Sequence, residues 1–344
     1  MTATRVINRN AMPALIEALM GPYRLHAPTV RDGVSHFGEI TAVEEVRLDL
    51  PNTDLSAKEL FLPRCENLFF FREGELVEAL PATDEPPRLL FGVRPCDAAS
   101  LPMLDAVFGD STAQDPYYVA RRAHTLLVGM ACNHPRSTCF CTSMGGGPFA
   151  TQGLDILLCD LGERYLLEPL SNAGQELLDR VASAPKVGLQ EATAAEQRAK
   201  ETLAQKATAA IRLPLETAEL AAHLAEMYDD PFWDELHQKC LGCGVCSYLC
   251  PTCHCFDVVD ETNGRQGRRA RIWDCCQYPL FTHHASGHNP RPTAKERMRQ
   301  RLMHKFRYFV DNYEQIACVG CGRCVRHCPV NMDIRQVIGA IMAR

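Results

Sequence analysis

One cysteine pattern occurs twice in this chain and constrains its fold more than any other feature. Both copies have the spacing C-x2-C-x2-C-x3-C-P, with Pro251 and Pro329 closing them. The cysteines are Cys240, Cys243, Cys246 and Cys250 in the first copy, and Cys318, Cys321, Cys324 and Cys328 in the second. A long insertion separates the copies, so two distant stretches of chain must fold into one cysteine-rich unit.

This spacing is typical of proteins that bind two [4Fe–4S] clusters, in which the fourth cysteine of each run ligates the other cluster. Glycines at 242, 244, 320 and 322 suit loops whose backbone curls closely around an inorganic core. We therefore predict two [4Fe–4S] clusters with crossed ligation. One would be bound by Cys240, Cys243, Cys246 and Cys328, and the other by Cys318, Cys321, Cys324 and Cys250.

Structural zinc is the alternative reading of the same cysteines. Zinc sites are usually built from separated C-x2-C knuckles rather than from four-cysteine runs closed by proline. The spacing therefore favours iron–sulfur clusters over a zinc-stabilised interaction module.

Composition limits the class of protein further. Eighteen cysteines in a chain without an apolar signal segment indicate metal ligands in a reducing compartment rather than disulfides. The formal charge of −6 argues against nucleic-acid binding. No apolar run approaches the roughly 20 residues needed to cross a bilayer, so we predict a cytoplasmic protein without a membrane span.

Three regions differ in composition along the chain. Residues 1–170 alternate short apolar runs with turns and predict an α/β or α+β domain. Residues 171–230 are rich in Ala, Glu, Leu and Gln and predict a helical connector. Residues 231–344 predict a helical, ferredoxin-like domain with two [4Fe–4S] clusters and a long insertion.

Four cysteines of the first region could form a third site. Cys96 and Cys132 each follow an apolar run, at 88–93 and 125–130, that reads as a buried strand. If these strands are neighbours, both cysteines lie at the same edge of the sheet, where open α/β sheets collect their sites. Cys139 and Cys141 follow shortly after Cys132, so four thiolates could converge there.

The remaining cysteines are harder to interpret. Cys253, Cys255, Cys275 and Cys276 lie in the insertion and could form a metal site, a redox-active thiol pair or inert packing. Cys65 and Cys159 have no companions nearby and are expected to be surface or core residues.

The insertion and the helix after it are rich in basic residues, which could dock an acidic partner or raise a cluster's potential. For individual residues we expect a solvated helix face, with Leu302, Met303 and Phe306 on its apolar side. The basic residues are Arg265, Arg268, Arg269, Arg271, Arg291, Lys295, Arg297, Arg299, Arg301, Lys305 and Arg307.

Several stretches resemble a known family. They include "DPFWDELHQKCLGCGVCSYLCPTCHCFDV", "RRARIWDCCQY", "CVGCGRCVRHCPVNMDI", "FGVRPCDAASLPMLD" and "CFCTSMG". They are similar to the β subunit of soluble cytoplasmic [NiFe] hydrogenases (sulfhydrogenases) and equally to the A subunit of anaerobic sulfite reductase. The resemblance spans nearly the whole chain and is weakest in the helical connector.

The resemblance implies a third [4Fe–4S] cluster at Cys96, Cys132, Cys139 and Cys141. It also makes Cys253, Cys255 and Cys276 family positions of unassigned role, whereas Cys275 stands where the family usually has serine. Such subunits pass electrons between a flavin-containing, NAD(P)-binding partner and a catalytic partner.

We therefore expect a non-catalytic electron-transfer subunit of a multi-subunit oxidoreductase, with a hydrogenase as the first choice of catalytic partner. The A subunit of an anaerobic sulfite reductase is the alternative. The chain has no G-x-G-x-x-G dinucleotide fingerprint, so the flavin and nucleotide would be bound elsewhere. A thiol-redox enzyme that uses Cys253, Cys255 and Cys276 is the alternative from another class.

Overall fold

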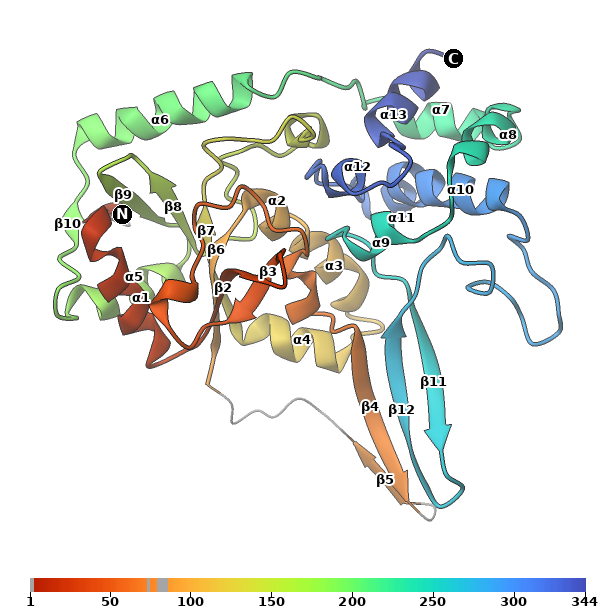
Figure 1. Ribbon diagram of the computed structural model, residues 1–344, viewed down its shortest axis with the longest axis horizontal. Coiled ribbons are helices and arrows are strands. Elements are labelled where there is room, and N and C mark those ends of the chain that lie inside the picture. The colour runs from red at the N-terminus through yellow and green to blue at the C-terminus, as the bar shows by residue number, and fades with distance from the viewer. Residues whose placement is uncertain (1–2, 73–74, 79–85) are drawn as a thin grey trace.

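The computed structural model describes residues 3–72, 75–78 and 86–344 (Figure 1). An eight-stranded sheet with the order β10-β1-β9-β8-β7-β6-β2-β3 forms the N-terminal part. The four adjacent strands β8, β7, β6 and β2 are parallel, and the flanking pairs are antiparallel. The strands are β1 (Arg5–Asn8), β2 (Arg24–Arg31), β3 (Val34–Glu39), β6 (Arg88–Val93), β7 (Thr125–Met130), β8 (Ile156–Asp160), β9 (Arg164–Pro169) and β10 (Gln190–Glu191).

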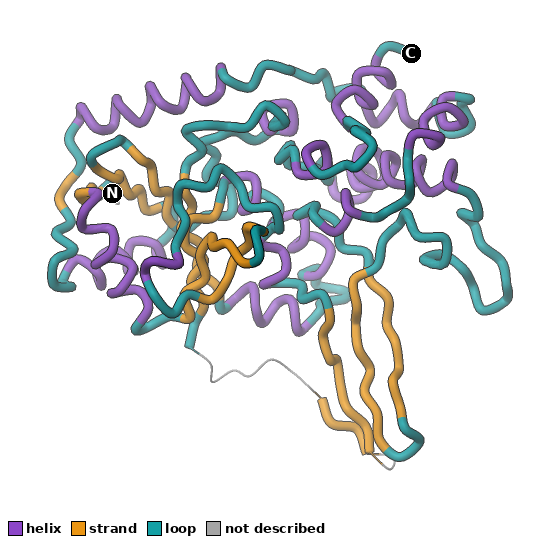
Figure 2. Tube along the Cα trace, viewed as in Figure 1, coloured by secondary structure: helices purple, strands orange, loops and turns teal. Residues whose placement is uncertain are grey.

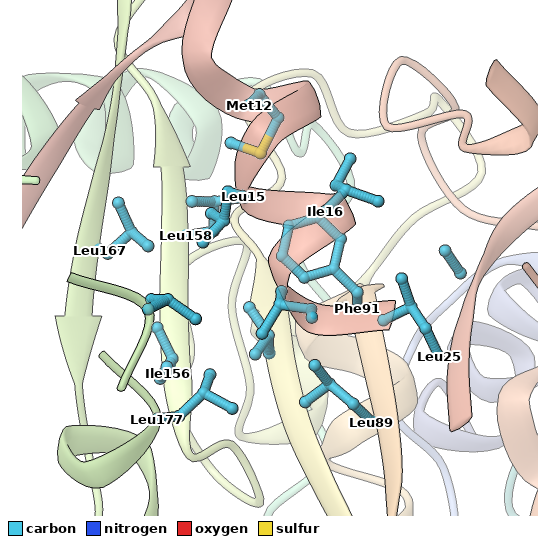
Figure 3. Close-up of a cluster of buried hydrophobic side chains, with 14 of the residues drawn as sticks. Met12, Leu15, Ile16, Leu25, Leu89, Phe91, Ile156, Leu158, Leu167 and Leu177 are labelled. Atoms are coloured by element: carbon cyan, nitrogen blue, oxygen red, sulfur yellow. The ribbon is translucent and has the colours of Figure 1, made fainter. Parts of the chain in front are cut away.

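The central strands are buried because helices cover both faces of the sheet. Parallel strands covered in this way read as continuous apolar runs. On one face α1 (Met12–Met20) packs against Leu89 and Phe91 of β6, as Figure 3 shows, and α5 (Asn172–Ala182) packs against β7 and β9. On the other face α3 (Leu101–Phe108) and α4 (Pro116–Ala123) pack against Leu90.

The structure confirms the strands expected at 88–93 and 125–130, which are β6 and β7. They are parallel neighbours, so the cysteines that follow them lie at the same edge of the sheet. The apolar segments on either side of residues 161–163 form the antiparallel pair β8 and β9.

A second sheet projects from the body as an arm (Figure 1) and combines strands of the N-terminal region with strands of the insertion. Its strand order is β11-β12-β4-β5. The strands are β4 (Cys65–Arg72), β5 (Glu75–Glu78), β11 (Phe256–Thr262) and β12 (Gln266–Trp273). Since β4 pairs with β12, the N-terminal region and the insertion between the cysteine runs share one sheet.

The C-terminal part consists mainly of short helices and loops (Figure 2). Its core contains Trp233, Phe306 and Ile338, all with 0% exposure. The helices are α7 (Leu220–Glu226), α8 (Phe232–Leu236), α9 (Val245–Tyr248), α10 (Ala294–Met303), α11 (Phe309–Tyr313), α12 (Arg323–Arg326) and α13 (Ile334–Met342). A π-helical turn, His304–Tyr308, continues α10 and leads into α11.

Residues 171–230, which were expected to form a helical connector, pack partly on the N-terminal sheet and partly on the C-terminal core. Helix α5 packs on the N-terminal sheet, and β10 pairs with β1 at the sheet edge. Helix α6 (Ala194–Ala209) is mostly exposed and packs against the N-terminal core through Leu203, whereas α7 contributes Leu220 and Leu224 to the C-terminal core. Two short helices beside the main sheet also matter for the site: α2 (Pro95–Ala98) and the 3-10 turn Cys141–Met144.

Within residues 3–72, 75–78 and 86–344, no helix combines the length and the apolar character that a membrane crossing requires.

Replacing Phe91 with Ala should destabilise the N-terminal sheet strongly. Its ring is 1% exposed, and truncating a buried Phe removes apolar contacts and leaves a cavity, at a cost of about 3–5 kcal/mol. The measurement is the urea midpoint of the anaerobic protein. Leu76→Ala is the control, because Leu76 is 64% exposed and its loss should cost less than about 0.5 kcal/mol. Equal midpoints for the two variants would contradict the packing described above.

Candidate iron–sulfur sites

The two cysteine loops adopt the same backbone conformation. Gly242 and Gly244 have φ values of 66° and 77°, and Gly320 and Gly322 have values of 62° and 75°. These left-handed angles strain residues with a Cβ atom, which explains glycine at all four positions. Each loop then enters a short helix, α9 or α12, that carries the third cysteine of the run.

Site 1 is a cavity lined by Cys240, Cys243, Cys246 and Cys328. This is the grouping that crossed ligation predicts, because Cys328 comes from the second run. The backbone N–H groups of Gly242 and Met332 point at the sulfurs of Cys240 and Cys328, at 3.4 and 3.2 Å. The rest of the lining is mostly apolar, and Leu241 at its rim is 68% exposed.

Site 2 is a second cavity, lined by Cys250, Cys318, Cys321 and Cys324. It again combines one cysteine from the first run with three from the second, as crossed ligation predicts. Three of its cysteines, Cys250, Cys318 and Cys321, are buried. Arg301 and Lys305 complete its wall, so site 2 is the more charged of the two.

Site 3 is a cavity at the edge of the N-terminal sheet, lined by Cys96, Cys132, Cys139 and Cys141. Cys96 lies in α2 directly after β6, and Cys132 follows β7, so the parallel pairing brings them together. The buried guanidinium of Arg94 also lines this cavity and donates hydrogen bonds to the carbonyl oxygens of Ala131 and Leu48, at 2.7 and 2.9 Å.

The three sites are adjacent and form a row. Cys324 lines both site 1 and site 2, and Cys321 lines both site 2 and site 3. Site 2 therefore lies between the other two. Neither the row nor its order could be read from the spacing of the cysteines.

The second cysteine loop is pressed tightly against the N-terminal domain. A Cβ atom at Gly320 would lie 2.5 Å from the backbone of Phe140, and one at Gly322 would lie 2.6 Å from the carbonyl oxygen of Thr138. The N–H of Phe140 donates to the oxygen of Gly320 at 2.8 Å. These contacts bring Cys139 and Cys141 of site 3 beside site 2.

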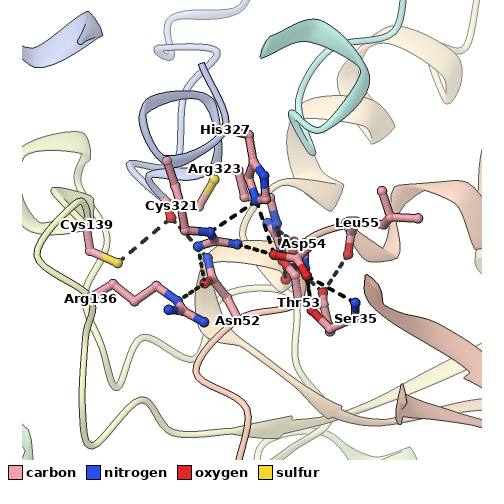
Figure 4. A network of polar contacts seen from close by, with 12 residues as sticks. Ser35, Asn52, Thr53, Asp54, Leu55, Arg136, Cys139, Cys321, Arg323 and His327 are labelled. Carbon is pink, nitrogen blue, oxygen red and sulfur yellow. Dashed lines mark hydrogen bonds and ion pairs between the residues drawn. The ribbon is translucent and has the colours of Figure 1, made fainter. Parts of the chain in front are cut away.

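Polar contacts fix the same junction (Figure 4). The Arg323 guanidinium donates two hydrogen bonds of 2.7 Å to the Asp97 carboxylate, and both side chains have 0% exposure. Asn52 donates to the carbonyl oxygen of Cys321 at 3.0 Å. Because Asp97 follows Cys96 and Arg323 precedes Cys324, this ion pair sets the position of site 3 relative to site 2.

Burial makes several of these cysteine thiols poor acids. It raises the pKa of Cys139 to about 11 and the pKa values of Cys141 and Cys318 to about 12. Thiols in this state become ligands only when a metal ion displaces the proton. Four cysteine side chains around each cavity, with buried cations nearby, suit an anionic thiolate-ligated cluster.

The expectation that the basic residues of 294–307 lie on a solvated face is wrong for Arg301 and Lys305. Their side chains are buried, and Arg301 donates to the carbonyl oxygen of Cys246 at 3.1 Å. Burial alone lowers the pKa of Lys305, but the thiolates of Cys250 and Cys253 outweigh it, and the pKa is raised. Both cations lie on the same helix face as the buried Met298, Leu302 and Phe306. The three- and four-residue spacing from Met298 to Phe306 is the sequence signal that indicates their burial.

Other basic residues have ordinary partners. Arg268 and Arg269 of β12 form ion pairs with Glu261 and Asp260 of β11 across the hairpin, at 2.8 and 2.6 Å. Leu302, Met303 and Phe306 are buried, as expected for the apolar side of the helix. Cys65 is exposed and Cys159 is a core residue of β8, which also agrees with expectation.

The cysteines of the insertion lie close to sites 1 and 2, with Cys275 and Cys276 beside Gln277 of site 1, and they are absent from the linings of the three cavities. The hairpin of β11 and β12 brings its two ends together, so that the N–H of Asp274 donates to the oxygen of Cys255 at 3.0 Å. Hydrogen bonds from Cys255 and Cys275 hold the pKa of Cys276 below its ordinary value. Arg301 reaches the sulfur of Cys253 at 3.8 Å.

The comparisons with known proteins agree with this geometry. Residues 239–332 match the family model of the 4Fe-4S dicluster domain, and this span contains both cysteine loops. The fold and the sites thus define an iron–sulfur protein of the dicluster class.

One relative extends the match to nearly the whole chain. The β subunit of sulfhydrogenase 2 from Pyrococcus furiosus is 32% identical over 330 residues, which cover 96% of this chain and 95% of that protein. The chain belongs to the family of hydrogenase β subunits, which are iron–sulfur, electron-transfer proteins. This match does not favour the alternative of a sulfite reductase subunit.

Replacing Cys139 and Cys141 together with Ser should remove one cluster from anaerobically purified protein. We expect the iron content to fall from about twelve to about eight per chain, since each cubane holds four irons. Cys65→Ser is the matched control, because Cys65 is exposed and lines none of the cavities. An unchanged iron content in the double variant would contradict the assignment of site 3.

Proposed function

We propose that this chain relays electrons through three [4Fe–4S] clusters between a flavin- and NAD(P)-binding partner and the catalytic subunit of a [NiFe] hydrogenase. The observation that carries the proposal is the row of cavities, in which neighbouring sites share a cysteine wall. When bound, such clusters take up and release single electrons at potentials tuned by their surroundings.

In this proposal the chain's residues hold the clusters and insulate them. Cys240, Cys243, Cys246 and Cys328 would bind the first, and Cys250, Cys318, Cys321 and Cys324 the second. Cys96, Cys132, Cys139 and Cys141 would bind the third. The lining of site 1 is largely apolar, and the junction between sites 2 and 3 is tightly packed.

The ends of the row are the places where partners would exchange electrons. Site 1 approaches the surface at Cys243 and Leu241, which are both exposed, whereas site 2 is enclosed by buried residues. Hydrogenase partners are supported by the relative, which is a subunit of a sulfhydrogenase, and the flavin-containing partner is what the family resemblance implies. We place the assembly in the cytoplasm, where thiolate ligands stay reduced.

Iron and acid-labile sulfide analysis of oxygen-free protein tests the proposal directly. We expect about twelve of each per chain, and an EPR signal after dithionite reduction. Stoichiometric zinc without iron would support a zinc-stabilised module instead. Turnover that persists after every cluster is removed, and that disappears when the thiols of Cys255 and Cys276 are alkylated, would support a thiol-redox enzyme.

Crossed ligation has its own test. Cys328→Ser should alter the same EPR signal as Cys240→Ser, because both residues line site 1. Cys250→Ser should instead alter the signal that Cys318→Ser alters, because these two residues line site 2. If Cys328→Ser and Cys318→Ser changed one common signal, each run would bind its own cluster and the crossed arrangement would be wrong.

A further inference from the structure

Lys305 carries a buried charge that the relay described above does not explain. The residue is 3% exposed and lies on the π-helical turn that follows α10. Its ammonium group donates hydrogen bonds to the sulfur of Cys250 at 3.3 Å, the hydroxyl of Thr252 at 3.0 Å and the carbonyl oxygen of Ala317 at 2.9 Å. All three N–H donors are therefore used.

No carboxylate pairs with this ammonium group in the described part of the chain. Burying a cation without a compensating anion costs several kcal/mol or more. The one acceptor that can carry a full negative charge is the sulfur of Cys250, which lines site 2. The position of Lys305 is thus favourable when that sulfur is an anionic ligand.

The other two sites lack this kind of contact in the hydrogen bonds of the described residues. At site 1 the sulfurs of Cys240 and Cys328 accept from the neutral backbone N–H groups of Gly242 and Met332. At site 3 the cation Arg94 donates to backbone carbonyl oxygens instead of to a sulfur.

Arg301 is a second buried cation near site 2, but it also lines site 1. Its guanidinium donates to Ser247 and to the carbonyl oxygen of Cys246, at 3.0 and 3.1 Å. Lys305 lines site 2 and is absent from the lining of site 1. It is therefore the residue whose charge acts mainly on one member of the row.

We propose that Lys305, acting through the sulfur of Cys250, makes site 2 the site of highest reduction potential in the row. The inference rests on the proposed function. Adding one electron to a cluster adds one negative charge, and a fixed cation in contact with a ligand sulfur stabilises that charge in a medium of low dielectric constant. An electron that enters from either end would then rest at the middle site.

The experiment is an EPR-monitored redox titration of the anaerobic full-length chain. The signal of site 2 is identified as the one that Cys318→Ser changes. In Lys305→Met, which removes the charge at similar length, the equilibrium constant for reducing site 2 should fall at least about tenfold, or about 59 mV for one electron. Sites 1 and 3 should shift much less.

Two further variants separate charge from hydrogen bonding. Lys305→Arg keeps the charge and should retain most of the wild-type potential, whereas Lys305→Gln keeps an N–H donor without charge and should resemble Lys305→Met. Lys295→Met is the matched control, because Lys295 lies on the preceding helix and pairs with Asp234 at the surface, at 2.8 Å. This control should leave all three potentials unchanged.

Three results would overturn the inference. An unchanged site 2 potential in Lys305→Met, or an equal shift of all three signals, would show that the ammonium group does not act on that site. Loss of about four irons from both Lys305→Met and Lys305→Gln would make Lys305 an assembly residue. Failure of the proposed function is distinguishable, because wild-type protein would then lack the iron itself.

Discussion

The buried ion pair between Arg323 and Asp97 is the interaction on which the arrangement of the sites depends. It links α12, which carries Cys324, to α2, which carries Cys96, across 226 residues of sequence. Neither charge is exposed, so removing one partner would leave the other buried and uncompensated. The pair therefore holds the C-terminal helical part against the N-terminal sheet in one orientation, and the close approach at Gly320 and Gly322 permits that orientation.

The second cysteine loop consequently connects all three sites. Its residues contribute to all three cavities: Cys328 to site 1, Cys318 to site 2, and Cys321 to both site 2 and site 3. The first loop contributes to sites 1 and 2 alone. A single loop thus sets the order of the row and joins the N-terminal cysteine site to the dicluster domain.

The three sites differ in the buried cations that surround them. Site 1 has a mostly apolar lining, site 3 has a cation whose donors are used by backbone carbonyl oxygens, and site 2 has a cation in contact with a cysteine sulfur. Buried cations of this kind are stable because thiolate-ligated clusters supply negative charge. The same lysine and arginine positions would be unfavourable in a core built from apolar side chains alone.

The sequence by itself indicated the groups of cysteines that line sites 1 and 2, because the C-x2-C-x2-C spacing and the positive-φ glycines act over a few residues. It also indicated β6 and β7 and the cysteines that follow them, because apolar runs reveal strands covered on both faces. Only the tertiary structure decided that the sites form a row, that β4 pairs with β12, and that Lys305 points inward. Those features depend on packing and charge compensation between residues far apart in the chain, which local spacing does not encode.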